Sequence, residues 1–455
     1  MAFGGSTTAP RREAAGRPRL LQAGVDAFGQ PDVRAKILFT LGMLLVFRFV
    51  AHIPVPGVDS DQLQQTFDQN AVLGFLNIFS GGALENLSVA ALGVYPYITA
   101  TIVMQLATPL IPRLQSLAQE GEAGRQQVQR YTHYMTVPLA AFQGIAQLVL
   151  IQQLGGISNV GWTLLTIATI ASMIAGTMFL VWLGELISEQ GIGNGVSVII
   201  LGGIVAGIPG LIGRGVLTGT QAAVTGIVIL GGITIGIVAL IVLFQEAQRR
   251  IPVQYARSTF RGGRLYRQQG QSHIPLRVNS AGMIPLIFAT SIMIFPPIFF
   301  QFVSQTADVG WISDVAGFLE AAFSPTGAVY WIGTFVLVVG FTFFYTMVVF
   351  SNQNLAENLQ RQGGFIPGIR PGRPTQEYIT RVLVRITWGG AIFLGLIAVL
   401  PFVVTQIADL LNIGGTAQAL QISATGLLIV VGVVIDTMRQ IEAQMMMRNY
   451  EGFIS

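Results

Sequence analysis

Long, nearly uncharged apolar segments recur along this chain, and they limit its possible folds more than any other feature. A helix needs about 17 to 25 such residues to cross a bilayer core of ~30 Å. Lipid offers no partners to backbone polar groups, so helices that bond internally are the expected form. We predict ten spans, with approximate bounds 36–52, 87–111, 135–154, 161–184, 196–213, 222–244, 281–303, 328–350, 382–405 and 419–438.

Composition and charge support this assignment. Charged residues make up 10% of the chain, whereas soluble domains carry roughly 25%. With the N-terminus inside, the predicted inner segments hold 23 of the 25 Lys and Arg residues, and Arg48 and Arg214 are the exceptions. This asymmetry follows the positive-inside rule. We therefore expect a multi-pass membrane protein with both termini on the inner side.

The predicted organisation is two halves between two tails. Residues 1–35 read as a cytoplasmic tail with a surface helix, and residues 441–455 as a second cytoplasmic tail. The halves, 36–218 and 219–440, would each hold five spans. An odd number of spans inverts the second copy of a repeat, so parity alone suggests an inverted pair.

The stretch before the second span is too short to cross a membrane. Residues 71–79 are apolar, and the adjacent Gly81 and Gly82 follow them. Nine helical residues reach only about 13 Å, less than half of a bilayer core. A glycine-broken apolar piece beside a full span is typical of a re-entrant or plug-like element. An amphipathic loop lying on the membrane surface is the alternative, and the pattern alone leaves both open.

Several classes of chemistry lack candidate residues in the sequence. There is no cysteine for a disulfide or a thiolate metal site, and His52, His133 and His273 read as ordinary loop residues rather than metal ligands. No metalloprotease, nucleophile-elbow or Walker A motif occurs. Spans 2 to 10 hold almost no ionisable side chain at mid-depth, where ion-coupled carriers place theirs. We expect neither an enzyme nor a cofactor.

Two long basic loops are predicted on the inner side, at 245–280 and 351–381. The first interleaves Tyr255, Phe260 and Tyr266 with arginines, and the second is rich in Gly and Pro turns. The arginines could serve only to set the topology. Long loops of this kind usually carry function, and clustered arginines suit an RNA backbone or an acidic protein surface. The sequence does not choose between these two partners.

Short motifs recur in these loops and around the spans. They are 53–57 (IPVPG), 79–84 (FSGGAL), 95–98 (YPYI), 191–195 (GIGNG), 249–251 (RRI), 273–279 (HIPLRVN), 282–285 (GMIP) and 363–372 (GGFIPGIRPG). Taken alone, the GIGNG segment would read as a turn that starts a helix. Together and in this order, the motifs resemble those of the SecY family of bacterial protein-translocation channels, and the resemblance runs from about Gln30 to Tyr450. One departure is Ser423-Ala424-Thr425, where the family more often has Gly-Gly-Thr. The resemblance implies a place in the bacterial cytoplasmic membrane.

The resemblance implies an all-α membrane protein of ten transmembrane helices, in two inverted five-helix halves around a central pore with a re-entrant plug helix. The plug maps to about residues 73–84, and its matching residues are Leu73, Phe75, Ile78, Phe79, Gly81, Gly82 and Leu84. The family's pore ring maps to Val94, Ile98, Val196, Ile200, Ile287 and Ile429. Two of the six are Val, so we expect a slightly wider ring.

The resemblance also implies a lateral gate between spans 2–3 and 7–8. Gln105, Thr290 and Ser291 match this seam, and we expect them to hydrogen-bond across it. The positions expected to contact the ribosome or the SecA motor are Arg249, Arg250, Arg257, Arg261, Arg264, Arg370 and Arg373.

The function implied is a channel subunit that moves unfolded preproteins across the membrane and inserts membrane proteins laterally. Its implied partners are SecE, SecG, SecA, the ribosome, signal peptides, nascent chains and lipid. A small-solute secondary transporter is the alternative, and it would need polar or charged sites at mid-membrane. A non-transporting helper is a third possibility, which would need neither a plug nor an apolar ring.

Overall fold

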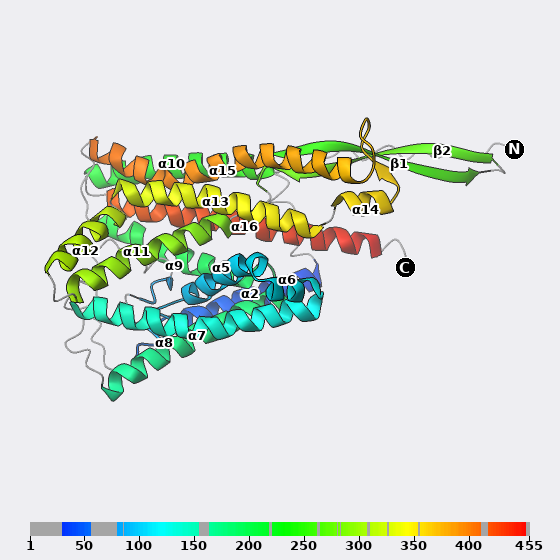
Figure 1. The fold of residues 1–455 in the computed structure, drawn as a ribbon. Helices are drawn as coiled ribbons and strands as arrows, with labels where there is room; N and C mark the ends of the chain where they lie inside the picture. Colours follow the sequence, from blue (N-terminus) through cyan, green and yellow to red (C-terminus); the bar gives the residue numbers. More distant parts are fainter. Residues whose placement is uncertain are drawn as a thin grey trace.

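The computed structural model describes residues 30–55, 80–84, 86–153, 163–217, 221–261, 264–279, 281–282, 284–306, 310–324, 327–353, 355–410 and 417–451. Within them, ten helices of 16 residues or more each overlap one predicted span (Figure 1). These are α2 (Pro31–Val50), α5 (Tyr95–Leu110), α7 (Glu122–Gln153), α8 (Leu164–Gln190), α9 (Gly195–Leu217), α10 (Gln221–Glu246), α11 (Ile284–Thr306), α13 (Ala328–Gln353), α15 (Arg373–Leu410) and α16 (Ala417–Glu451).

Four helical segments in the described part are long and apolar enough to cross a membrane. They are Leu164–Gln190, Ile284–Ser304, Ala328–Val348 and Arg373–Leu400. Gly195–Gly207 and Ile235–Glu246 are shorter apolar helices. The count of ten spans therefore stays a prediction, although the helices that it requires are present.

The helix predicted for the second span, 87–111, is not formed over its first third. We expected a helix from Leu87, but α5 begins at Tyr95, and its 16 residues measure about 24 Å. Leu87 and Gly93 adopt positive φ angles of 38° and 57°, which a right-handed helix does not allow. The segment instead bonds to the chain after α2, because Val55 N–H donates to Leu87 O at 3.0 Å. Irregular backbone survives here because protein, not lipid, surrounds it.

Other helices extend past the predicted spans into polar sequence. α7 begins at Glu122 rather than near 135, and α15 begins at Arg373 rather than near 382. α16 continues to Glu451, so part of the predicted C-terminal tail is helical. Hydropathy marks only the stretch that suits lipid, whereas a helix can continue into water wherever its backbone bonds persist.

The predicted loop 245–280 is largely a β-hairpin. Strands β1 (Gln248–Arg261) and β2 (Arg264–Arg277) pair antiparallel along their whole lengths. Fourteen residues at ~3.3 Å each make the hairpin about 46 Å long. It projects from one end of the helical bundle, and the short helix α12 (Gly310–Phe323) lies at the opposite end (Figure 1).

The second predicted loop joins the hairpin. β3 (Gly364–Phe365) adds to β1 with Gln254 opposite Phe365, giving the strand order β2-β1-β3. Helix α14 (Leu355–Arg361) precedes β3. Buried side chains from both segments form one cluster under the sheet, namely Ile251, Val253, Leu276, Leu359, Ile366, Ile379 and Val382. The two predicted loops are therefore one packed unit.

Candidate functional site

The six side chains matched to the pore ring occupy one hydrophobic cluster. Five are buried members of the largest cluster, and Val196 packs against it. They come from four helices that are distant in sequence: α5 with its N-cap Val94, then α9, α11 and α16. The structure thus brings these residues to one region, and their arrangement as a ring stays a prediction.

The turn between α8 and α9 sets the position of Val196 and Ile200. It contains the GIGNG segment, and Asn194 Oδ1 accepts from the Ser197 N–H at 3.3 Å, as a helix N-cap does. Two further bonds hold the turn: Gly193 N–H donates to Gln440 of α16, and Ile192 N–H to Thr40 of α2. The segment therefore does start a helix, and it fixes that helix against two others.

The predicted plug falls partly outside the described residues, which exclude Leu73, Phe75, Ile78 and Phe79. The described part, 80–84, packs directly on α9. A Cβ at Gly81 would lie 2.6 Å from Gly203 Cα, so no side chain fits between the two backbones. Gly203 lies one turn after Ile200 on α9. The end of the predicted plug therefore rests one turn from a predicted ring residue.

Further contacts hold residues 80–84 in place. Arg48 Nη1 of α2 donates to Gly81 O at 2.6 Å. Leu84 N–H donates to Ser80 Oγ at 3.1 Å, and Leu84 is fully buried. Gly82 has φ of 82°, as Gly81 has φ of 71°, but no atom lies within 4 Å of where its Cβ would be. Gly81 is thus constrained by space as well as by conformation, and Gly82 only by conformation.

The helices of the predicted lateral gate are in contact. The hydroxyl of Tyr95 on α5 donates to the backbone oxygen of Ser291 on α11. Phe142 on α7 and Phe295 on α11 bring their ring centroids to 6.1 Å. α5 and α7 therefore both contact α11 along the predicted seam.

The polar side chains predicted to bond across that seam behave differently. The hydroxyl of Thr290 lies 3.0 Å from both Leu286 O and Ile287 O, so its donor is used within its own helix. Ser291 is buried and Gln105 is half-buried. Bonds from any of the three residues across the seam therefore stay a prediction.

The arginines matched to ribosome or motor contacts lie on the joined β unit and at the start of α15. Arg249 and Arg250 are exposed on β1, while Arg257, Arg261 and Arg264 lie farther along the hairpin toward its turn. Arg370 is exposed in the turn before α15, and its carbonyl accepts from Thr375 Oγ1 at 2.8 Å. Arg373 is exposed and lies 3.6 Å from Glu377.

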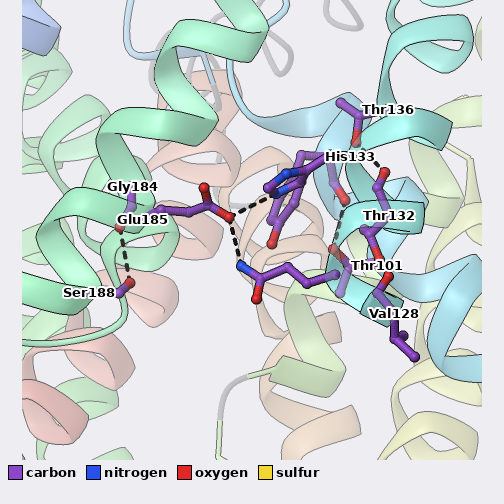
Figure 2. A network of polar contacts seen from close by, with 10 residues as sticks. Thr101, Val128, Thr132, His133, Thr136, Gly184, Glu185 and Ser188 are labelled. Atoms are coloured by element: carbon purple, nitrogen blue, oxygen red, sulfur yellow. Dashed lines mark hydrogen bonds and ion pairs between the residues drawn. The ribbon is translucent and has the colours of Figure 1, made fainter. Parts of the chain in front are cut away.

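A polar network between α7 and α8 was missed by the sequence analysis. Figure 2 shows His133 and Glu185 pointing toward each other, with Nε2 and Oε1 2.7 Å apart. Gln129 Nε2 donates to the same oxygen at 2.6 Å, and the Tyr97 ring lies 5.7 Å from the imidazole. Reading His133 as a loop residue was wrong, because it lies inside α7. The spacing of Gln129 and His133, one helical turn apart, was the available signal.

The other two histidines give no metal site either. His52 Nδ1 lies 2.7 Å from Arg48 O at the end of α2, and His273 lies in β2 rather than in a loop. Among the residues that the structure describes, no group of three or more His, Cys, Asp or Glu could hold a metal ion.

Comparison with known proteins now decides the family. The SecY family model matches residues 88–438. The chain is 43% identical to the protein translocase subunit SecY of Streptomyces griseus, over 94% of this chain and 98% of that one. It is 44% identical to the same subunit of Halalkalibacterium halodurans, over 93% and 97%. The chain belongs to the SecY family.

Solved structures agree with the fold of the SecY family. A protein-conducting channel superposes with a TM-score of 0.62 at 16% identity, covering 90% of this chain and 92% of that one. Sec61 from a canine ribosome-channel complex gives 0.61 at 16% identity, with the same coverage. The predicted class, an all-α membrane protein with the SecY channel fold, is confirmed.

We expect Glu185→Gln to weaken the contact between α7 and α8. The two side chains are 24% and 26% exposed, so replacing the carboxylate costs only about 1 kcal/mol, which lowers Tm by roughly 2 °C in a chain of this size. Thermal melting of the purified protein measures the change. Glu189→Gln, one turn along on the exposed side of α8, is the matched control. Equal melting temperatures for both variants would contradict the assigned role of Glu185.

Proposed function

We propose that this chain is the channel subunit of a protein translocase, which conducts unfolded preproteins across the bacterial cytoplasmic membrane and inserts membrane proteins into it. One observation carries the proposal. Alkyl side chains from four separate helices share a central cluster, and residues 80–84 pack against α9 one turn from Ile200. Relatives above 40% identity named as translocase subunits support it.

The chemistry of the cluster suits a polypeptide channel. A narrow ring of apolar groups expels water and so blocks ions, yet it offers a passing peptide no specific bond. The β-branched side chains of Val and Ile also have few rotamers, which keeps the constriction defined. Such a constriction would block small ions and let an extended polypeptide pass through.

A small-solute carrier is not favoured. Ion-coupled carriers keep charged or titratable groups inside the membrane. Among the described residues, the fully buried polar side chains are those of Ser, Thr, Asn, Gln and Tyr, and no Asp, Glu, His, Lys or Arg is fully buried. A helper that transports nothing would not need backbone packed on backbone at Gly81 and Gly203 beside the apolar cluster.

The lateral route is proposed along the seam of α5 and α7 with α11. One contact there is apolar, the pair Phe142 and Phe295, and another is the hydrogen bond from the Tyr95 hydroxyl to Ser291 O. An apolar signal peptide can replace the apolar contact at little cost in free energy, because one hydrophobic surface takes the place of another. We assign Gln105 and Ser291 to this seam.

Partners on the inner side are proposed for the joined β unit. Two structural neighbours are channels bound to ribosomes, the canine Sec61 complex and the yeast Ssh1 complex, the latter with a TM-score of 0.56. Exposed Arg249 and Arg250 and the arginines toward the hairpin turn suit a phosphate backbone. The motor SecA would use the same face, and SecE and SecG would complete the complex. Both termini then lie in the cytoplasm.

We expect Gly81→Ala to raise the resting ion conductance of the channel several-fold, because its Cβ would push residues 80–84 off α9. Planar-bilayer recording of the purified complex measures this. Gly82→Ala is the matched control, since it carries the same cost of positive φ but meets no neighbour. Deletion of residues 73–84 should raise the resting ion conductance more than either substitution does. Unchanged conductance in both Gly81→Ala and the deletion would refute the plug.

We expect Arg370→Glu to reduce protein export at least tenfold while leaving the amount of folded protein unchanged. The residue sits in a turn held next to the hairpin by β3, where a docking partner would meet it. Translocation of a preprotein into vesicles by the motor measures the effect. Arg361→Glu on α14, where Arg361 pairs only locally with Glu357, is the control. Normal export by Arg370→Glu would count against this contact.

A further inference from the structure

α12 lies outside the predicted spans and has one exposed apolar face. Trp311 is 69% exposed, Val315 51% and Phe318 73%. These residues are four and three positions apart, so they lie on one side of the helix. Three large apolar side chains gathered this way are unusual for a surface that faces only water.

The opposite side of α12 is bonded to α11 through polar side chains. Ser313 Oγ donates to Ser304 O at 2.7 Å, and Ser304 Oγ donates to Glu320 Oε2 at 3.1 Å. Ser313 and Glu320 are seven positions apart, about half a turn around the helix from the apolar face. These bonds fix which way α12 is rotated, so the apolar face must point away from α11.

The place of α12 in the fold identifies what covers that face. Ser304, its attachment point, ends the candidate membrane span Ile284–Ser304, and the next candidate span begins at Ala328. α12 therefore sits where both helices leave the bilayer, at the end away from the hairpin (Figure 1). Phe299 of α11 and Val329 of α13, close to this end, are also exposed and apolar. The apolar face continues a surface that lipid already covers.

We propose that α12 is an interfacial membrane anchor, with Trp311, Val315 and Phe318 inserted into the lipid at the outer boundary of the bilayer. Tryptophan favours this zone because its ring is apolar and its N–H is polar. The anchor ties the outer end of α11, one wall of the seam, to the membrane surface. The proposal rests on membrane embedding, which the SecY family shares, and not on protein conduction.

The charges of α12 make the proposal more specific. Its sequence has Asp314 and Glu320 but no Lys or Arg, so attraction to anionic headgroups cannot contribute. Binding should therefore depend on buried apolar area alone. Anionic headgroups would repel these two carboxylates, so an anionic bilayer should not hold the helix more tightly than a neutral one.

The absence of cysteine makes a direct test simple. A single cysteine at Val315 is labelled with an environment-sensitive fluorophore in the full chain, reconstituted into phosphatidylcholine vesicles with or without phosphatidylglycerol. Quenching is measured with doxyl lipids labelled near the headgroup or deep in the acyl chain, and with iodide in water. Ile332 on α13 serves as the lipid-exposed reference, and Glu357 on α14 as the aqueous one.

We expect the probe at Val315 to be quenched at least threefold more by shallow doxyl lipid than the probe at Glu357, and at least threefold less by iodide, in both lipid mixtures. Trp311→Ser with Phe318→Ser should restore iodide quenching. If that pair of changes prevents folding, the single-label comparison still decides. Quenching like that at Glu357 would place the face in water. Protection from both quenchers would mean that protein covers it. Either result would overturn the anchor.

Discussion

Backbone polar groups cannot be left unpaired in lipid, and this constraint shapes everything else in the molecule. It forces the apolar segments into helices that satisfy their own N–H and C=O groups. It also explains why the irregular stretch before α5 is wrapped in protein. Leu87 and Ser88 are fully buried, and their neighbours bond to the segment after α2. A broken element at membrane depth is permitted only where other helices enclose it.

The same enclosure creates the proposed seal. Glycine at 81 and 203 lets two backbones approach closely, so the segment before α5 can lie against α9 without a gap. The apolar side chains beside it need no polar partner and leave water nothing to bind. In the proposed mechanism, an arriving polypeptide would have to break this close packing and the bond from Arg48 to Gly81 O.

The sequence predicted the positions of the helices well, because twenty consecutive apolar residues have few other solutions. The prediction was wrong where a segment rich in polar residues forms regular secondary structure. The hairpin was read as a loop because of its arginines, although Ile251 and Val253 alternate with exposed residues, as a strand requires. It failed again at Leu87, whose positive φ has no local signal. His133 and Glu185 could not be paired without knowing that α7 lies beside α8.

The resemblance to the SecY family supplied what periodicity could not, the identity of six residues among dozens of similar ones. The structure then placed five of these six in its largest buried cluster and the sixth against it. The structure bears less directly on the lateral gate, since the hydroxyl of Thr290 donates within its own helix and bonds across the seam stay a prediction. Burial in one cluster requires only shape and apolarity, whereas a hydrogen bond requires two groups in one specific geometry.

The measurement that tests the central claim most directly is photocrosslinking of a stalled nascent chain to probes at Ile98 and Ile287, with Ile332 on the exposed side of α13 as reference. If polypeptide passes through the apolar centre, both buried positions crosslink to the same residues of the chain in transit, and Ile332 does not. Crosslinks at Ile332 with none at Ile98 and Ile287 would show that the polypeptide takes another path, and the account would be wrong.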